Sequence, residues 1–260
     1  MMEGQRRSQN EEGPTDTCGP PSTAMVLAAG FGTRLGPLTD HTPKCMVPIG
    51  GQPLVEHTIG WLRRYGVTKI IINLCHLPDG VRKHFGDGAN WDVEIAYSLE
   101  SQPMGTAGGV KKVSHLFKGP FFVWYGDNLS TCRLDRLWEF HRSRHSAATI
   151  ALFQREDPSQ SGIVELGSQD RITRFLEKPG PHEIFSTWVS AGIFVLEPEV
   201  LSAIPADTPA DFGRDVFPAL LAADRPLYGY RMSGDERLWW IDTPADLERV
   251  QIEWNRRRPS

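Results

Sequence analysis

The chain has 260 residues, of which 40% are hydrophobic and 23% charged, a composition typical of soluble globular proteins. Its formal net charge of −4 provides no basic field for nucleic acid, so we expect no nucleic-acid partner. No apolar run approaches membrane-spanning length and the N-terminus lacks a signal-like start, so we expect no membrane association. Four widely spaced cysteines fit neither a zinc knuckle nor a disulfide framework, which favours reduced thiols in a cytoplasmic protein.

The first half of the chain alternates between predicted strands and helices. Residues 1–22 are polar and rich in Gly, Pro, Ser and Glu, which predicts a disordered tail. The run at 24–29 is wholly apolar, as in a central strand of a parallel sheet, and a glycine-rich loop follows it to about residue 51. We then expect helices at 53–65, 81–85, 107–117 and 134–144, and strands at 67–74, 93–99, 120–125 and 147–153.

The second half is richer in strands, which we expect at 162–166, 172–176, 187–196 and 227–232. Helices are predicted at 212–222 and 244–256, the last with Thr243 as its N-cap and Pro244 at its first position. The alternation predicts an α/β fold, a three-layer Rossmann-like sandwich with a mostly parallel central sheet, followed by a strand-rich part. We expect a single domain at 23–257. Since there are no hexapeptide repeats, we expect no β-helix domain.

The strongest chemical signal lies in the loop after the first strand. Gly30 and Gly32 allow a backbone to approach phosphates closely, and Thr33 adds a hydroxyl donor. Arg34 can form bidentate hydrogen bonds with phosphate oxygens. Lys44, ten residues later in the loop, can contact the same oxygens as a single positive charge. The loop lacks the third glycine of the Rossmann fingerprint and the Gly-Lys-Ser/Thr of the Walker loop. The pattern therefore favours phosphoryl or nucleotidyl transfer by another kind of site.

The residues at 27–39 (LAAGFGTRLGPLT) and 43–48 (PKCMVP) resemble the signature of the sugar-phosphate nucleotidyltransferases, the NDP-sugar pyrophosphorylases. The chain is most similar to bacterial mannose-1-phosphate and heptose-1-phosphate guanylyltransferases, through 73–77, 86–88, 97–100 and 105–109. The resemblance runs from about residue 24 to 247. It implies the nucleotide-diphospho-sugar transferase fold, with a nucleotide-binding half at about 23–150 and a sugar-binding half at about 151–257. It implies an NTP and a sugar 1-phosphate as substrates and leaves a homo-oligomer open.

The nucleotide site implied by the resemblance is drawn from the first half. Its segment 100–106 faces the nucleobase in the family. The Glu100 carboxylate only accepts hydrogen bonds, so it suits the N1–H and 2-amino group of guanine and is repelled by the carbonyls of uracil and thymine. This favours GTP, with UTP and dTTP as alternatives, although a solvated strand end is the simpler interpretation of this glutamate. The implied nucleotide-binding residues are Leu27, Ala28, Ala29, Gly30, Gly32, Thr33, Arg34, Lys44, Glu100, Pro103, Gly105 and Thr106.

The sugar site implied by the resemblance comes mainly from the second half. Glu177-Lys178-Pro179 matches the family's EKP triplet, whose lysine meets the sugar's phosphate and whose glutamate meets its hydroxyls. Ser190-Ala-Gly192 matches the family's NAG, with serine in place of asparagine. The sugars implied are of the mannose or heptose type. The implied sugar-phosphate-binding residues are Asn128, Gly162, Glu177, Lys178, Ser190 and Gly192.

Two carboxylates are candidates for a metal site. Asp127 ends the apolar run at 121–125, and Asp242 ends a second run that begins at Trp239. In the resembling family such a pair holds the catalytic metal, so the expected cofactor is Mg²⁺, which prefers oxygen ligands. The family's W-x-D-x-G-T motif has Pro244 in place of its glycine here. Capping of the last helix is therefore an alternative role for Asp242.

The implied reaction is an in-line displacement, in which a sugar-phosphate oxygen attacks the α-phosphorus of the NTP and pyrophosphate leaves. Arg34 and Lys44 would stabilise the developing charge, Lys178 would position the nucleophile, and Asp127 completes the catalytic set. Uridylyl or thymidylyl transfer to another sugar 1-phosphate, and a non-catalytic nucleotide-sugar-binding subunit, remain alternatives. A cytidylyl- or molybdopterin-type transferase fits the EKP triplet less well. The sequence has no HExxH or GxSxG motif, which argues against zinc and serine-hydrolase sites.

Overall fold

The computed structural model describes residues 19–257. Most of the predicted tail, residues 1–18, lies outside the described residues. The last four residues of that segment are described, and there Pro21 is buried and the Ser22 carbonyl accepts hydrogen bonds from the Thr68 and Lys69 amides. None of the helices described is long and apolar enough to cross a membrane.

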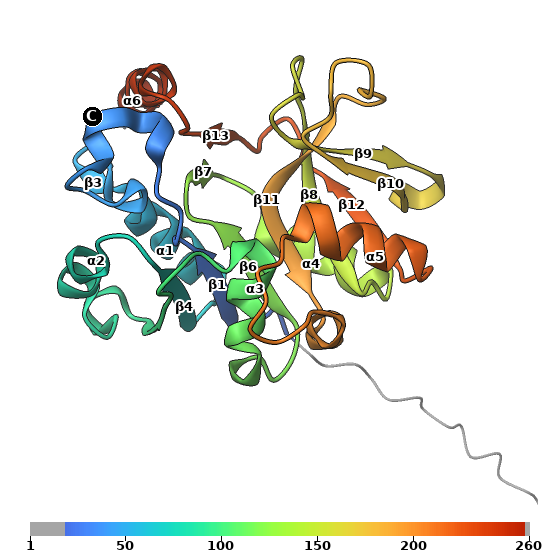
Figure 1. Cartoon of the computed structure of the whole chain (residues 1–260), viewed down its shortest axis with the longest axis horizontal. Coiled ribbons are helices and arrows are strands. Elements are labelled where there is room, and N and C mark those ends of the chain that lie inside the picture. Colours follow the sequence, from blue (N-terminus) through green and yellow to red (C-terminus); the bar gives the residue numbers. More distant parts are fainter. Residues whose placement is uncertain (1–18, 258–260) are drawn as a thin grey trace, which may run out of the picture.

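Each predicted helix and strand is present in the described part of the chain (Figure 1). The helices are α1 Leu54–Arg64, α2 Pro78–Phe85, α3 Gly105–Lys112, α4 Leu134–Ser143, α5 Phe217–Ala222 and α6 Pro244–Arg257. The strands are β1 Thr23–Leu27, β2 Pro48–Ile49, β3 Gln52–Pro53, β4 Lys69–Leu74, β5 Glu94–Leu99, β6 Phe121–Tyr125, β7 Asn128–Ser130, β8 Ala148–Gln154, β9 Gly162–Leu166, β10 Ile172–Glu177, β11 Trp188–Leu196, β12 Leu227–Arg231 and β13 Leu238–Trp240.

Some helix boundaries differ from the expectation. The helix predicted at 107–117 begins earlier, at Gly105, and gives way after Lys112 to a 3-10 turn at Ser114–Leu116. The helix predicted at 212–222 opens with a π-helical turn, Phe212–Val216, before α5. Asp211 caps that turn, because its side chain accepts hydrogen bonds from the amides of Gly213 and Arg214.

The central sheet, nine-stranded within residues 19–257, has the order β10-β9-β11-β6-β1-β4-β5, with β8 and β12 branching from β11. Strands β6, β1, β4 and β5 are mutually parallel, whereas β11 runs antiparallel to both β6 and β8. The predicted mixed, mostly parallel sheet is therefore confirmed. The parallel strands are apolar runs because both of their faces are covered, and Ala24, Met25 and Val26 have no exposed surface.

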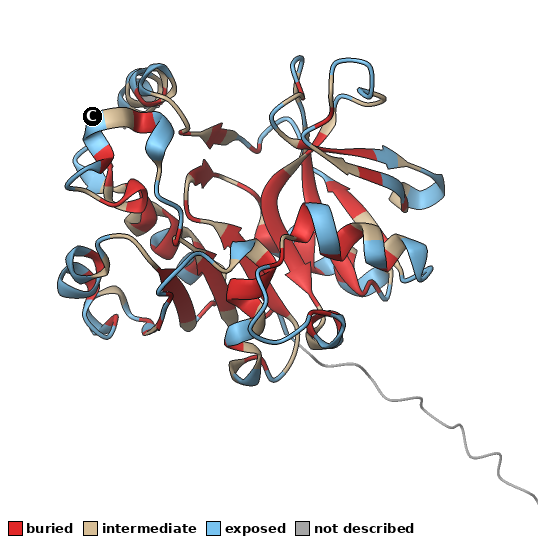
Figure 2. Cartoon of the chain, viewed as in Figure 1, coloured by how far each residue is buried: buried red, intermediate tan, exposed pale blue. Residues whose placement is uncertain are grey.

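Helices cover both faces of the sheet, which makes the three layers (Figure 2). Successive residues of a strand point to opposite faces. Met25 and Val123 therefore join the core under α3 and α5, while Val26 and Trp124 join the core under α1, α2 and α4. A third, smaller core packs β13 and α6 against the loop before α1, through residues such as Leu35, Trp239 and Ile241.

A small ladder stands apart from the central sheet, and the sequence did not predict its β7 strand. Strand β7 pairs antiparallel with β13, with Asn128 opposite Trp240 and Ser130 opposite Leu238. Asp127 immediately precedes β7, and Asp242 follows β13 by two residues. The ladder therefore brings two segments more than a hundred residues apart in sequence to the same place.

Candidate active site

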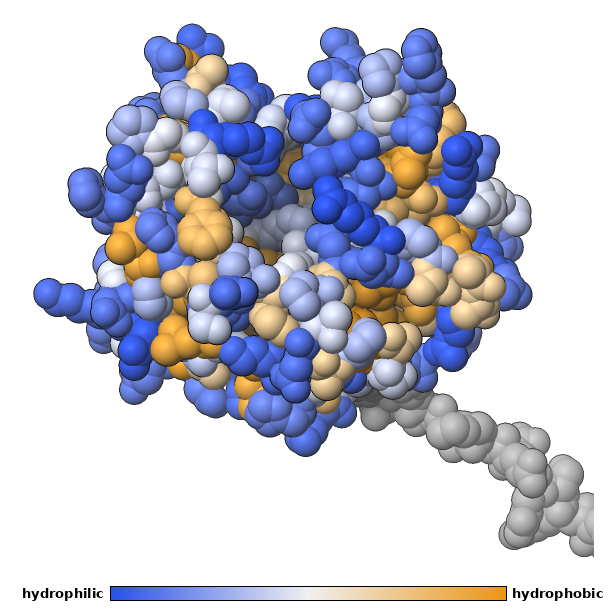
Figure 3. Space-filling view, viewed as in Figure 1, coloured by the Kyte–Doolittle hydropathy of each residue, from blue (hydrophilic) through white to orange (hydrophobic). Residues whose placement is uncertain are grey.

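A first cavity opens at the carboxyl ends of the parallel strands, where α/β sheets commonly bind ligands. A second cavity adjoins it, and Thr106, Tyr125, Asp127 and Asp211 line both. Figure 3 shows a hollow bordered mainly by hydrophilic side chains between the parts of the molecule that carry α6 and β9. The arrangement provides two adjacent binding spaces with a shared wall.

Most of the predicted nucleotide-binding residues line the first cavity: Leu27, Ala28, Ala29, Gly30, Lys44, Glu100, Pro103, Gly105 and Thr106. Arg34 lines the second cavity instead. Gly32 and Thr33 line neither. Gly32 has a structural reason to be glycine, because its φ is 67° and a Cβ there would lie 2.9 Å from the Lys44 Cβ.

An ion cluster lies where the two cavities meet. The Lys44 ammonium is 2.8 Å from an oxygen of Asp127 and 2.8 Å from an oxygen of Asp242. Arg34 contacts the same Asp242 oxygen at 2.9 Å. Burial by itself lowers the pKa of Lys44, but the charges of Asp127 and Asp242 outweigh it and raise this pKa above its ordinary value. Lys44 is therefore a permanent cation between two carboxylates.

The geometry also bears on the alternative role of Asp242. The start of α6 is capped by Thr243 and Asp246, since the Asp246 amide donates to the Thr243 hydroxyl and the Thr243 amide donates to the Asp246 carboxylate. The predicted N-cap at Thr243 is thus confirmed. The Asp242 carboxylate points to Lys44 and Arg34 instead, which leaves it at the cavities.

The acidic pair fits a cation shared with a phosphate ligand. Within residues 19–257 no group of three or more His, Cys, Asp or Glu side chains is arranged to hold a metal ion. Mg²⁺ is commonly held by one or two carboxylates together with substrate phosphates and water. Asp127 and Asp242 supply two carboxylates whose oxygens already converge on one cationic group, the Lys44 ammonium. The donor set is therefore suited to Mg²⁺ bound jointly by protein and nucleotide.

Glu100 is buried rather than solvated, so the simpler interpretation of this residue as a solvated strand end is wrong. It is 5% exposed, and its two oxygens accept hydrogen bonds from the Asn73 side-chain amide at 2.8 Å and the Met104 backbone amide at 2.9 Å. Asn73 in turn accepts from the Ala28 amide at 2.8 Å. This chain of hydrogen bonds links the segment 100–106 to the residue that follows β1. Sequence reasoning missed Asn73, whose signal was a polar residue inside the apolar run of β4.

The second cavity is lined by all the predicted sugar-phosphate residues: Asn128, Gly162, Glu177, Lys178, Ser190 and Gly192. Gly192 lies at an irregularity in the pairing of β11 with β8 and has a φ of 67°. A Cβ there would lie 2.8 Å from both the Asn128 side-chain amide and the Tyr125 ring. The Asn128 amide itself donates to the Ala191 carbonyl at 2.9 Å. The glycine therefore allows Asn128 to reach the cavity wall.

Asp211 is the most prominent cavity residue that the sequence did not reveal. It accepts a hydrogen bond from the Thr106 hydroxyl at 2.8 Å, and it lines both cavities. Burial and the nearby Asp211 charge raise the pKa of Glu177 above its ordinary value. Burial, and then Asp211, likewise raise the pKa of Tyr125 well above its usual range. Its position just before the helix predicted at 212–222 signals only an N-cap; its contact at the cavities is with Thr106, about a hundred residues away in the chain.

Arg155 and Trp240 form another unpredicted part of the second cavity. The Arg155 guanidinium lies over the Trp240 ring at 4.1 Å from its centre and donates to the Ser161 hydroxyl at 3.2 Å. The Trp240 ring adds an aromatic surface to the cavity that Asp242 also lines.

Comparison with known proteins finds a matching family and relatives with similar sequences. The profile of the nucleotidyl transferase family matches residues 23–248. A UTP–glucose-1-phosphate uridylyltransferase of Synechocystis sp. is 36% identical over 233 residues, covering 84% of this chain and 59% of the relative. A mannose-1-phosphate guanylyltransferase of Mycobacterium tuberculosis is 36% identical over 230 residues, covering 87% of this chain and 62% of the relative. The chain thus spans about three fifths of the length of these curated relatives.

A solved structure from Bacillus anthracis, provisionally named a glucose-1-phosphate thymidylyltransferase and bound to a sucrose, superposes with a TM-score of 0.81 at 22% identity. The superposition covers 92% of this chain and 97% of that one. This likeness shows a shared fold. The predicted nucleotide-diphospho-sugar transferase fold is therefore confirmed.

Proposed function

Because this chain belongs to the nucleotidyl transferase family, we propose that it transfers a nucleoside monophosphate from an NTP to a sugar 1-phosphate and releases pyrophosphate. The observation that carries the proposal is the meeting of two adjacent cavities at Asp127, beside the cluster of Lys44, Arg34 and Asp242. A bimolecular transfer between two phosphates needs two binding spaces with cationic groups at their junction. Retention of this cluster favours an enzyme over a non-catalytic binding subunit.

The two cavities support a separate place for each substrate. The NTP would occupy the first cavity, with its α-phosphate near Lys44, and the sugar 1-phosphate would occupy the second, with Lys178 holding its phosphate. A sugar-phosphate oxygen would then attack the α-phosphorus, and the bond to the departing pyrophosphate would break. Lys44 and Arg34 would neutralise the negative charge that develops in the displacement. A phosphate monoester is already a nucleophile, so no covalent enzyme intermediate is required.

Asp127 and Asp242 would hold the divalent metal on which this family generally depends. When bound there, Mg²⁺ would supply Lewis-acid chemistry to the transferring phosphate. The protein's own contribution is to keep the two carboxylates converged through the Lys44 ammonium and to keep Arg34 beside Asp242. Since the Arg34 side chain is half exposed, its contact with Asp242 is weak enough to be exchanged for a phosphate.

GTP is the nucleotide we favour. Each carboxylate oxygen of Glu100 can accept more than one hydrogen bond, so the contacts from Asn73 and Met104 leave acceptor capacity for the edge of guanine. Equal identity to a uridylyltransferase and a guanylyltransferase favours neither base, so the assignment rests on Glu100. A sugar 1-phosphate of the mannose or heptose type and a cytoplasmic location complete the proposal.

Pyrophosphate release tests the proposal. Release should require an NTP, a sugar 1-phosphate and Mg²⁺ together, and excess chelator should abolish it. Asp127→Asn should lower turnover roughly 10²–10³-fold, the usual cost of removing a group that acts mainly on the transition state. Asp79→Asn, at an exposed site on α2, is the matched control and should leave turnover unchanged. Full activity in Asp127→Asn would contradict the assigned site.

A further inference from the structure

A buried carboxylate lies outside both cavities, at the turn before β13. Glu236 is 4% exposed. Three basic side chains lie near it in the described part of the chain: Arg133 pairs with Asp135, Arg136 pairs with Asp235, and Arg237 donates to the backbone carbonyls of Gly234 and Glu236 rather than to the Glu236 carboxylate. A buried acid without an ion-pair partner is costly unless hydrogen bonds satisfy it.

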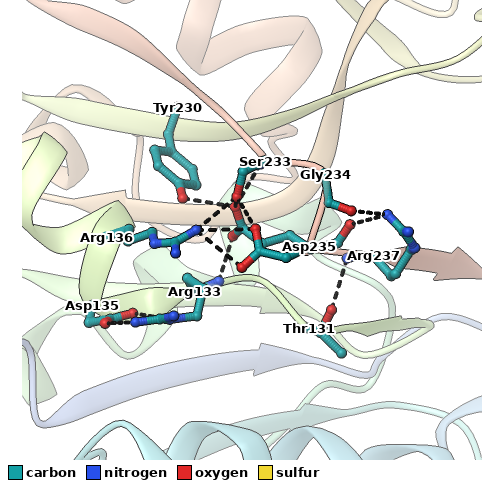
Figure 4. Close-up of polar contacts among 10 residues, drawn as sticks. Thr131, Arg133, Asp135, Arg136, Tyr230, Ser233, Gly234, Asp235 and Arg237 are labelled. Carbon is teal, nitrogen blue, oxygen red and sulfur yellow. Dashed lines mark hydrogen bonds and ion pairs between the residues drawn. The ribbon is translucent and has the colours of Figure 1, made fainter. Parts of the chain in front are cut away.

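The donors that satisfy Glu236 come from β12 (Tyr230), from the turn after it (Ser233) and from the segment just before α4 (Arg133), and all three are labelled in Figure 4. One oxygen accepts from the Arg133 backbone amide at 2.6 Å, just before α4. The other accepts from the Tyr230 hydroxyl at 2.9 Å, and from the amide and hydroxyl of Ser233, each at 2.7 Å. The carboxylate thus ties the end of β12 and the following turn to the segment between β7 and α4.

The same turn leads directly into the β7–β13 ladder. The Thr131 amide donates to the Arg237 carbonyl at 2.9 Å, and the Arg237 amide donates to the Thr131 hydroxyl at 2.8 Å. The regular pairing begins at the next residue, with Ser130 opposite Leu238. Glu236 is therefore fixed at the entrance of the ladder, and Asp127 and Asp242 emerge at its other end.

The two aspartates depend on this ladder to different degrees. Asp127 follows β6 of the central sheet, and the amide of Gly126 donates to the Leu27 carbonyl at 2.8 Å, so its backbone is held independently. Asp242 lies on a segment that leaves the central sheet after β12, pairs with β7 and then enters α6. A one-residue slip of β13 on β7 would turn its side chains to the opposite face.

We propose that Glu236 is a positioning residue that fixes the register of β13 on β7 and thereby places the Asp242 carboxylate beside Asp127. The inference rests on the proposed function in one respect, that these two aspartates hold a divalent cation. Glu236 touches no substrate and acts only through the ladder.

Glu236→Gln is the sharpest test, because every group that binds this side chain is a donor in the wild type. In either orientation of the glutamine side chain, its NH₂ group would face a donor that the carboxylate now accepts from. At least one hydrogen bond would therefore be lost, while the side chain keeps nearly the same volume. Asp235→Asn is the matched control. It lies in the same turn and contacts the same Ser233 hydroxyl, but it is exposed and reaches α4 only through the exposed Arg136 side chain, whereas Glu236 holds the Arg133 backbone amide.

Mn²⁺ binding, followed by the electron paramagnetic resonance signal of the free ion in the absence of substrates, reports the acidic pair without requiring catalysis. Glu236→Gln should weaken Mn²⁺ binding about tenfold, as removal of an outer-shell support does in other metal sites, whereas Asp235→Asn should bind like the wild type. If Glu236→Gln does not fold, Tyr230→Phe removes a single donor and should weaken binding by about threefold, a smaller fraction of the same outer-shell effect.

Folded Glu236→Gln with wild-type Mn²⁺ affinity would overturn the inference and leave the proposed function untouched. Equal loss in Asp235→Asn would also overturn it, since the effect would then belong to the turn as a whole. A wild type that binds no Mn²⁺ would contradict the metal assignment itself, and the inference with it.

Discussion

At the scale of single residues, the site depends on charges that face one another at short range. Lys44 contacts both Asp127 and Asp242 and lines the first cavity, while Lys178 lines the second. The two lysines were expected from the sequence to act on different substrates. Their positions support that division, because Lys44 lines the first cavity and Lys178 lines the second.

Kinetics of two alanine variants should separate these lysines. Lys44→Ala removes a charge that strengthens its interaction in the transition state, so kcat should fall roughly 10²–10³-fold. Lys178→Ala removes a group that binds ground and transition states alike, so the KM for the sugar phosphate should rise while the KM for the NTP changes little. Steady-state rates with each substrate varied in turn would measure this. A rise in the NTP KM alone for Lys178→Ala would refute the division.

The pair of Glu177 and Asp211 predicts a pH effect. Burial and the Asp211 charge raise the pKa of Glu177, so its carboxylate becomes protonated at a higher pH than an ordinary glutamate as the solution is acidified. Asp211→Asn removes a negative charge and should lower this pKa. The acid limb of kcat/KM for the sugar phosphate, which reports the free enzyme, should then move to lower pH. An acid limb that stays in place, or that also moves in the exposed control Asp207→Asn, would disprove the coupling.

At the scale of elements, the sequence predicted the buried strands well, because a strand covered on both faces is a short apolar run that ends in turn residues. It missed β7, whose residues Asn128–Ser130 are short and mostly polar and pair with a strand more than a hundred residues away. The π-helical turn before α5 was also missed, since it depends on the Asp211 cap. The cavity roles of Asn73 and Asp211 were also missed, because their contacts with Ala28 and Thr106 join segments far apart in the chain.

Strand β11 offers an element-scale test at Gly192. Alanine there would have to adopt a left-handed conformation and would press against Asn128 and Tyr125, so unfolding free energy should fall by about 2–5 kcal/mol. Displacement of Asn128 should also raise the KM for the sugar phosphate. Gly119→Ala is the control, because its Cβ would meet no atom within 4 Å. Urea denaturation in which both variants match the wild type would contradict this account of the bulge.

At the scale of the whole molecule, one continuous sheet within residues 19–257 carries residues of both cavities. The parallel strands supply the first cavity, and the antiparallel extension through β11, β9 and β10 supplies much of the second. Asp127 lies between β6 and β7 and lines both cavities, where the parallel strands meet the antiparallel extension. The fold therefore accounts for the juxtaposition of the two cavities.

The most direct test of the transfer reaction is ³¹P nuclear magnetic resonance of the wild-type protein with Mg²⁺ and a sugar 1-phosphate, using GTP, UTP and dTTP in turn. We predict that each NTP consumed yields one pyrophosphate and one nucleoside diphosphate sugar. GTP should react fastest, and Glu100→Gln should reduce its advantage. Use of UTP or dTTP at least as well as GTP would refute the assigned base. Pyrophosphate formed without the sugar phosphate, or no nucleotide sugar from any pair of substrates, would contradict the proposed function.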